Sequence, residues 1–279
     1  MRRRTQRPNQ PAKPAWHGKK KHAPRQDGAD RVMLFGLHAV EAALANPKRP
    51  VLRCVATDNA AQRLGPLLAK RGLKPEPASP RDLDRLLGAE AVHQGVALEA
   101  EPLPPVTLDE VDDLAILLVL DQVTDPQNVG AALRSAAAFG ASGLVMTERH
   151  SPPLQGVLAK AASGALDIVP LILVKNLAQS LAELGERGFL RVGLAEEASE
   201  ALETAPLQRP LALVLGAEGK GLRQLTREHC DRLCRISTQS ALASLNVSNA
   251  AAVALHWASL ALAASRPAAN NFGQGGASR

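Results

Sequence analysis

The sequence has little aromatic character, since only 2% of its 279 residues are aromatic: four Phe, two Trp and no Tyr. Between residues 32 and 266 the aromatic residues are Phe35, Phe139, Phe189 and Trp257, too few for the usual base-stacking platform. Three cysteines cannot form a disulfide framework, which fits a reducing cytoplasm. No unbroken apolar run reaches about 18 residues, so we expect no membrane-spanning helix. The N-terminal stretch lacks the apolar core of a signal peptide, so we expect no secretion by that route.

The charge is unevenly distributed along the chain. The formal net charge is +6, and residues 1–31 alone hold ten Lys or Arg and two Asp, a net charge of +8. The other 248 residues carry 23 basic and 25 acidic side chains, a net charge of −2. The basic segment has four prolines and almost no apolar pattern, so we expect a disordered arm. Such an arm attracts polyanions through their phosphates; the plainer alternative is a solubilising tail.

Between this arm and a polar, Gly-rich tail at 267–279, the pattern predicts two folded units. Residues 32–100 combine helical apolar spacing with short strands, which predicts a small α/β domain. The Pro-rich, acidic stretch 101–113 predicts a linker. Residues 114–266 alternate apolar strands with helices and end in a long helix at 246–264, which predicts an α/β domain with a mainly parallel sheet. The strands expected in this domain are 114–121, 143–147, 167–173, 189–195, 211–216 and 233–237.

The first segment with candidate functional residues is LDQVTDPQNVGAALRSAAAFG at 120–140. A buried strand ends at Asp121, and a polar turn leads into a helix. Asn128 is placed to cap that helix, and Arg134 lies six residues further on. A charged side chain among alanines needs water or a partner. Taken alone, an ordinary cap at Asn128 and a solvated Arg134 explain this segment without any ligand.

The second segment is LVLGAEGKGL at 213–222, where a buried strand runs into three glycines around Glu218. A glycine such as Gly216 lets the backbone approach a ligand closely. The spacing fits neither the P-loop nor the dinucleotide fingerprint. A tight turn between strand and helix is the alternative to a ligand-binding loop.

The third segment is ISTQSALASLNVSNAAAVAL at 236–255, at the start of an Ala-rich helix. It gathers the polar residues Ser244, Asn246, Ser248 and Asn249. One helix cap needs only one such side chain. The others indicate a ligand site at the free amides of the helix N-terminus, or they are solvated neighbours.

In this order the three segments resemble the motifs of the SpoU (TrmH-type) RNA ribose 2′-O-methyltransferases of the SPOUT superfamily. FGLHAVEAAL and HQGVALEA resemble the RNA-binding domain that precedes the catalytic domain in ribosomal-RNA members, so the resemblance covers about residues 33–262. It implies a parallel sheet whose C-terminal segment threads a trefoil knot. The usual rules of chain connectivity would not predict this, because true knots are rare exceptions. It also implies a cytoplasmic homodimer, not bound to a membrane, that acts on RNA with S-adenosylmethionine.

The resemblance assigns roles to individual residues. Gly216, Ile236 and Leu245 would contact the cofactor, with Ser244 as a weaker candidate. Arg134 would activate the ribose hydroxyl, which is a poor nucleophile until its proton is removed or polarised. Because arginine stays protonated in proteins, we expect it to act together with an RNA phosphate rather than as a simple base. The residues that would orient Arg134 and the ribose are Asn128, Glu218 and Asn246.

The chain departs from the family pattern beside the third motif. The family has a Pro-Met pair after the motif's Ile and a Gly two positions further, where this chain has Ser237, Thr238 and Ser240. The backbone contacts of Ile236 can survive this change. The shape around the cofactor is expected to differ.

Cys230 and Cys234 lie four residues apart beside His229. A zinc site needs about four ligands, and no second pair is visible. We therefore expect ordinary structural positions and no metal site.

The two-domain layout favours a guanosine of 23S ribosomal RNA as the substrate, because transfer-RNA members usually lack such a leading domain. A transfer-RNA substrate is the first alternative, and methylation of an adenosine for antibiotic resistance is the second. The changed residues 237–240 raise a third, a non-catalytic RNA-binding factor for ribosome assembly. The intact set of Asn128, Arg134, Glu218 and Asn246 argues against it.

Overall fold

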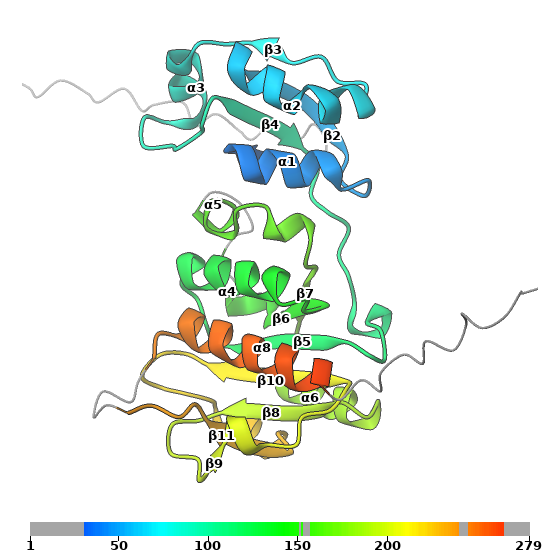
Figure 1. The fold of residues 1–279 in the computed structure, drawn as a ribbon, viewed down its shortest axis with the longest axis vertical. Coiled ribbons are helices and arrows are strands. Elements are labelled where there is room, and N and C mark those ends of the chain that lie inside the picture. Colours follow the sequence, from blue (N-terminus) through cyan, green and yellow to red (C-terminus); the bar gives the residue numbers. More distant parts are fainter. Residues whose placement is uncertain (1–30, 151, 153–156, 240–244, 265–279) are drawn as a thin grey trace, which may run out of the picture.

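The computed structural model describes residues 31–150, 152, 157–239 and 245–264 (Figure 1). The leading domain is a four-stranded sheet in the order β1-β4-β2-β3, in which β4 pairs antiparallel with both β1 and β2. Helix α1 packs against α2 and carries most of its buried side chains toward the sheet. The elements are β1 (Val32–Phe35), α1 (Leu37–Ala45), β2 (Val51–Ala56), α2 (Asp58–Lys70), β3 (Glu76–Pro77), α3 (Pro80–Leu87) and β4 (Val96–Ala100).

Local sequence explains where α3 begins. Ser79 precedes Pro80, which is tolerated at the first helical position because its missing N–H would have no partner there. The Ser79 hydroxyl accepts a hydrogen bond from the Asp82 amide at 3.3 Å, and the Asp82 carboxylate accepts one from the Ser79 amide at 3.0 Å. This reciprocal pair is a capping box, so Ser79 caps the helix as its position before Pro80 predicts.

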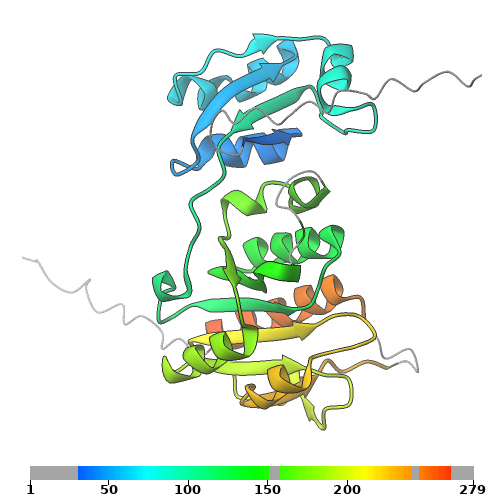
Figure 2. The same ribbon diagram turned by 180° about the vertical axis from the view of Figure 1, so that it is seen from behind.

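The second sheet is parallel throughout, in the order β7-β6-β5-β10-β8-β11-β9. The prediction of a mixed α/β chain with a large parallel sheet is therefore confirmed. Figure 2 shows the chain after β4 running along one side of the molecule to reach this sheet, and it forms η1 (Leu108–Glu110) on the way. The strands are β5 (Ile116–Asp121), β6 (Gly143–Thr147), β7 (Leu171–Val174), β8 (Leu190–Leu194), β9 (Glu200–Ala201), β10 (Leu211–Gly216) and β11 (Arg232–Arg235).

Helices cover both faces of this sheet, so its central strands are buried on both sides. Leu118 and Leu120 of β5 pack in one core with α4 and α8, while Leu117 and Val119 pack in the other with α6. This explains why β5 is a continuous apolar run rather than an alternating one. The connecting elements are α4 (Pro126–Ala138), η2 (Glu148–His150), α5 (Val157–Ala162), η3 (Ala165–Asp167), α6 (Leu177–Glu186), η4 (Leu202–Thr204), α7 (Gln224–Glu228) and α8 (Val247–Ala264).

The expected strand 167–173 is wrong over its first half. Gly164 adopts a φ of +89°, and the chain turns through η3 before β7 begins at Leu171. Pro170 has no N–H to donate to a neighbouring strand, which further delays the start of pairing. An apolar run alone does not show such a turn.

Helix α8 forms where the sequence predicts a long helix, and it is more apolar than the absence of a long unbroken apolar run indicates. It has 18 residues with a mean hydropathy of 1.4, so by length and composition alone it could cross a membrane. In the structure, Val247, Ala251, Leu255 and Leu262 are buried in the main core. Helix α8 packs along α4 and over β10 (Figure 1). One face of α8 is therefore part of the core of the parallel-sheet domain.

Candidate active site

The carboxyl ends of β5 and β10 lie side by side in the middle of the second sheet. Gly216 at the end of β10 pairs in register with Asp121 at the end of β5. From β5 the chain continues through β6 and β7 toward one edge, whereas β8 and β11 lie on the other side of β10. Ligands of open α/β sheets bind in the crevice formed outside the strand ends where the order switches in this way. Gln122, directly after β5, has a φ of +58°, a backbone conformation that clusters at functional sites.

Three polar side chains from three distant segments meet beside this point. Glu218 Oε1 accepts hydrogen bonds from Asn246 Nδ2 at 2.7 Å and from Asn128 Nδ2 at 3.1 Å. Asn246 Nδ2 also donates to Asn128 Oδ1 at 3.0 Å. These bonds orient both amides and hold the ends of α4 and α8 against the loop after β10. We call Asn128, Glu218 and Asn246 the polar cluster.

The expected cap at Asn128 is wrong. Asp125 precedes Pro126 and accepts a hydrogen bond from the Gln127 amide at 3.1 Å, so Asp125 caps α4. Asn128 lies in the first turn, and its side chain is free to join the polar cluster. Asn246 has two functions, because its Oδ1 also accepts from the Ser248 amide at 2.9 Å and so caps α8.

A cavity of about 470 Å³ opens next to the polar cluster at the ends of β8, β10 and β11. Three residues that the family resemblance assigns to the cofactor line it: Gly216, Ile236 and Leu245. Glu218 lines it as well, whereas Ser244 lies outside the described residues. A side chain at Gly216 would place its Cβ 2.1 Å from the carbonyl carbon of Gly221, so only glycine lets the loop fold back over the strand end.

The cavity is also lined by charged residues that the sequence motifs did not indicate. Arg227 forms an ion pair with Glu197, and both line the cavity wall. A hydrogen bond from its own backbone amide, together with Arg227, lowers the pKa of Glu197 below its usual value. Arg235 also lines the wall and donates to the carbonyl of Ala198 at 3.0 Å. They come from loops and short elements with no helical or strand periodicity, so only the folded sheet shows that they converge.

An ion pair between a buried carboxylate and a half-exposed arginine anchors the loop that closes the cavity. Asp121 is completely buried and accepts hydrogen bonds from the Arg223 backbone amide at 3.0 Å and from Arg223 Nε at 2.7 Å. The pair ties the chain after Gly221 to the end of β5. Asp121 was recognisable in the sequence as the single acidic residue that ends a buried strand.

Comparisons with known proteins agree with this geometry. Residues 115–256 match the model of the SpoU rRNA methylase family, and residues 33–106 match the model described as RNA 2′-O ribose methyltransferase substrate binding. The chain belongs to the SpoU rRNA methylase family. Curated relatives named 23S rRNA (guanosine-2′-O-)-methyltransferase RlmB include one from Pseudomonas aeruginosa, 41% identical over 233 residues, covering 80% of this chain and 93% of the relative. Another, from Shewanella oneidensis, is 42% identical over 234 residues and covers 80% and 94%.

Solved structures share the fold of this SpoU methylase. The SpoU methyltransferase AviRb from Streptomyces viridochromogenes, in complex with AdoMet, aligns with a TM-score of 0.69 at 23% identity, covering 82% of this chain and 89% of that one. The AdoMet-bound rRNA methyltransferase from Sinorhizobium meliloti aligns with a TM-score of 0.70 at 22% identity, covering 82% and 86%. At this level of identity the likeness establishes the fold. The trefoil knot stays a prediction from the family.

Arg134 of this SpoU methylase is exposed on α4. It lies six positions after Asn128, which corresponds to about 9 Å along the helix axis. In the part of the chain that the structure describes, no hydrogen bond or ion pair joins Arg134 to the polar cluster. The structure thus brings Asn128, Glu218 and Asn246 together and leaves Arg134 facing solvent.

The unusual residues after Ile236 are held by a carboxylate. Ser237 Oγ donates to Glu203 Oε2 at 3.1 Å, and the Ser237 amide donates to Oε1 at 3.3 Å. Ser237 and Thr238 both line the cavity, and Ser240 lies outside the described residues. The departure from the family pattern therefore adds two hydroxyl groups to the cavity wall.

The cysteines occupy ordinary structural positions in this domain. Cys234 is buried in β11, and Cys230 donates to the carbonyl of Thr226 at 3.2 Å. Burial raises the pKa of the Cys230 thiol to about 12, which keeps it neutral. Over the described ranges, no group of three or more His, Cys, Asp or Glu side chains is placed to hold a metal ion.

Proposed function

We propose that this SpoU methylase transfers a methyl group from S-adenosylmethionine to the ribose 2′-oxygen of a guanosine in 23S ribosomal RNA. The observation that carries the proposal is the polar cluster, in which Glu218 Oε1 binds the amides of Asn128 and Asn246 at 3.1 and 2.7 Å beside the cavity. A cluster built from three separate motifs at the strand ends provides fixed dipoles next to a ligand-sized space.

The cavity fits S-adenosylmethionine in size and polarity. Its volume of about 470 Å³ lies within the range of about 300–1,000 Å³ usual for small-molecule sites. Ile236 and Leu245 line the cavity with apolar side chains and Arg227 and Glu197 line it with opposite charges, so these residues would suit a cofactor that has both apolar and zwitterionic parts. When bound, the cofactor supplies an electrophilic methyl group on sulfur. Gly216 and the backbone around it would hold the cofactor at the end of β10.

The residues of the polar cluster would orient the ribose. An in-line transfer requires the 2′-oxygen, the methyl group and the sulfur to be aligned, which needs donors and acceptors in fixed positions. Glu218 fixes the amides of Asn128 and Asn246, and these amides would contact the sugar. Arg134, exposed on α4, is available to bind an RNA phosphate, and together they would polarise the 2′ O–H bond.

The substrate assignment rests on the leading domain and on the relatives. The match to a substrate-binding model spans residues 33–106, and relatives about 40% identical over nearly their whole length are named for a 23S rRNA guanosine. We assign residues 32–100 to RNA binding, 101–113 to a linker and 114–266 to methyl transfer. The enzyme would act in the cytoplasm, where bacterial ribosomal RNA is found.

We also propose a homodimer. Val253 and Leu260 lie seven residues apart on α8, so they share a face, and both are exposed. Exposed apolar side chains on a helix of the catalytic domain support the dimer that the family resemblance implies. Analytical ultracentrifugation of the protein used in the assay below measures the association state, and a monomer at assay concentration would contradict this part of the proposal.

The test is methyl transfer from labelled S-adenosylmethionine to purified 23S rRNA or transfer RNA, followed by mapping of alkali-resistant ribose positions. We expect one labelled guanosine in 23S rRNA. Glu218→Gln should lower the rate by about a hundredfold or more, the scale of losing one oriented group in an active site. Glu228→Gln is the matched control, because Glu228 is exposed on α7 outside the cavity.

Other outcomes separate the alternatives. Transfer to transfer RNA alone, or to an adenosine, would move the substrate assignment to one of the other family activities. No transfer to either RNA, with wild type equal to Arg134→Ala, would refute the enzyme and leave an RNA-binding assembly factor.

A further inference from the structure

The two domains meet at a buried ion pair that the proposed reaction does not use. Arg49 follows α1 in the leading domain and Asp167 ends η3 in the catalytic domain; their side chains are 5% and 2% exposed. Arg49 Nε donates to Asp167 Oδ1 at 2.8 Å and Nη2 donates to Oδ2 at 3.1 Å. Such a two-point contact fixes orientation as well as distance. The third nitrogen, Nη1, donates to the carbonyl of Glu101 at 3.0 Å, where the linker begins.

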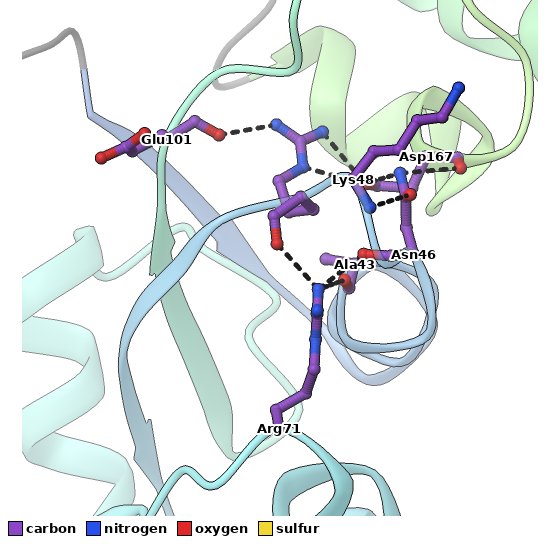
Figure 3. A network of polar contacts seen from close by, with 7 residues as sticks. Ala43, Asn46, Lys48, Arg71, Glu101 and Asp167 are labelled. Carbon is purple, nitrogen blue, oxygen red and sulfur yellow. Dashed lines mark hydrogen bonds and ion pairs between the residues drawn. The ribbon is translucent and has the colours of Figure 1, made fainter.

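Neighbouring groups hold both charges in place, as Figure 3 shows. Asn46 Nδ2 donates to Asp167 Oδ1 at 3.1 Å and to its backbone carbonyl at 3.2 Å. Arg71 Nη2 donates to the carbonyls of Asn46 at 2.5 Å and Arg49 at 2.7 Å, which ties the turn after α1 to the end of α2. The pair is thus part of a network that spans the leading domain, the linker and the catalytic domain.

The backbones of the two domains are also in close contact beside this pair. A side chain at Gly164 would place its Cβ 2.7 Å from Ala42 Cβ and 2.8 Å from the carbonyl oxygen of His38, both on α1. Leu166 packs against the hydrophobic core of each domain. The leading domain therefore rests directly on the segment that joins α5 to β7.

That segment is in turn fixed to the helix that carries part of the polar cluster. Gly130 of α4 lies so close to α5 that a Cβ there would be 2.4 Å from Ala161 Cβ and 2.8 Å from the Ala162 amide nitrogen. Asn128 is two residues away on the same helix. A short run of packed backbone thus connects Arg49 in the leading domain to Asn128.

We infer that Arg49 and Asp167 are positioning residues that lock the RNA-binding domain at a fixed distance and angle from the polar cluster. This inference rests on the proposed function, since it assigns the leading domain to RNA. With the lock in place, RNA bound by the leading domain meets the cavity in one orientation. If an unlocked domain spends about a tenth of its time in that orientation, the apparent dissociation constant for RNA rises about tenfold. Neither residue lines the cavity, so affinity for S-adenosylmethionine stays the same.

The test is the full-length double variant Arg49→Met/Asp167→Asn, which removes both charges and leaves no unpaired buried ion. The matched control is Arg232→Met/Glu200→Gln, which removes an ion pair of 2.9 Å within the catalytic domain, outside the cavity and away from the domain junction. Small-angle X-ray scattering without RNA measures the spacing of the domains. Methyl-transfer kinetics give KM for 23S rRNA and kcat, and calorimetry gives the affinity for S-adenosylmethionine.

We expect a larger radius of gyration and an RNA KM raised about tenfold, with kcat within about twofold of wild type and unchanged cofactor affinity. The control should match wild type in every measurement. Arg49→Lys keeps the charge but offers one donor group in place of three contacts, so it should change scattering and KM in the same direction with the fold intact.

Three results would overturn the inference: wild-type scattering and wild-type KM, an expanded molecule with an unchanged KM, or a raised KM without expansion. If the double variant does not fold, Arg49→Lys is judged by the same criteria. A wild-type protein that methylates no RNA speaks against the proposed function instead. Scattering and direct RNA-binding titrations would then still decide whether the pair positions the leading domain.

Discussion

Replacing either partner of the Asp121–Arg223 pair should destabilise the protein, and the two replacements should differ in size. Arg223→Ala leaves the Asp121 carboxylate, which is completely buried, without a cation. Breaking a buried ion pair from one side costs about 3–5 kcal/mol, because a charge stays buried and unpaired. Asp121→Ala leaves the Arg223 side chain, which is 43% exposed and can be solvated by water. The loss is then mainly two hydrogen bonds, about 2–3 kcal/mol in total.

These values correspond to measurable shifts in melting temperature. For domains of this size about 1 kcal/mol shifts Tm by about 2–4 °C, so we expect losses of about 6–20 °C for Arg223→Ala and about 4–12 °C for Asp121→Ala. Urea unfolding followed by circular dichroism measures the same difference through the midpoint. Glu76→Gln is the control, since it removes an exposed ion pair with Arg53 and should leave the midpoint unchanged.

The order of the two variants is the decisive result. An Asp121→Ala protein less stable than Arg223→Ala would refute the argument that the unpaired buried carboxylate dominates. Equal midpoints for wild type and both variants would show that the pair does not anchor the loop at all.

Two further predictions concern the thiols and the basic arm. Burial raises the pKa of Cys54 and Cys234 to about 11 and that of Cys230 to about 12, so the thiols stay neutral at pH 8. Iodoacetamide should label them slowly in the folded protein and fully in guanidinium chloride; rapid labelling of the native protein, read by mass spectrometry, would contradict this. Deleting residues 1–31, which hold ten Lys or Arg, should weaken RNA binding and reduce the slope of log K against log salt concentration. An unchanged slope in a filter-binding titration would remove the arm from RNA recognition.

Much of the fold could be predicted from the apolar runs. The runs at β5 and β10 are continuous because helices cover both faces of a parallel sheet. A short continuous apolar run therefore predicts a strand that is buried on both faces. Strand β7 begins later than its apolar run predicts, because the turn at Gly164 and the missing N–H of Pro170 are backbone effects that hydrophobicity does not record.

The candidate site was predictable only in part. The order of the three motifs indicated Asn128, Glu218 and Asn246, and the structure brings their side chains within 3.1 Å of one another. The order of the motifs also indicated Arg134. It lies apart from the cluster because it is six positions after Asn128 on α4. Cavity residues such as Arg227 could not be predicted, since α7, which carries it, has only five residues and is too short to show a periodicity from which a direction can be inferred.

The junction between the domains was not foreseen at all. Arg49 and Asp167 are single charged residues in turns, 118 positions apart, and such residues are normally solvated. Only the docking of α1 onto η3 buries them.

The polar cluster also has a consequence for how the enzyme matures. Asn128 lies 90 positions from Glu218 and 118 from Asn246, while Glu218 and Asn246 are 28 apart, and the three meet at a sheet made of parallel strands. Contacts of such long sequence separation form late and slowly, because the entropy of closing large loops must be overcome first. Most of the sheet should therefore form before Asn128 can join Glu218 and Asn246. Partly folded chains can be compact and still lack this arrangement, so we expect the polar cluster to be among the last features of the native state to form.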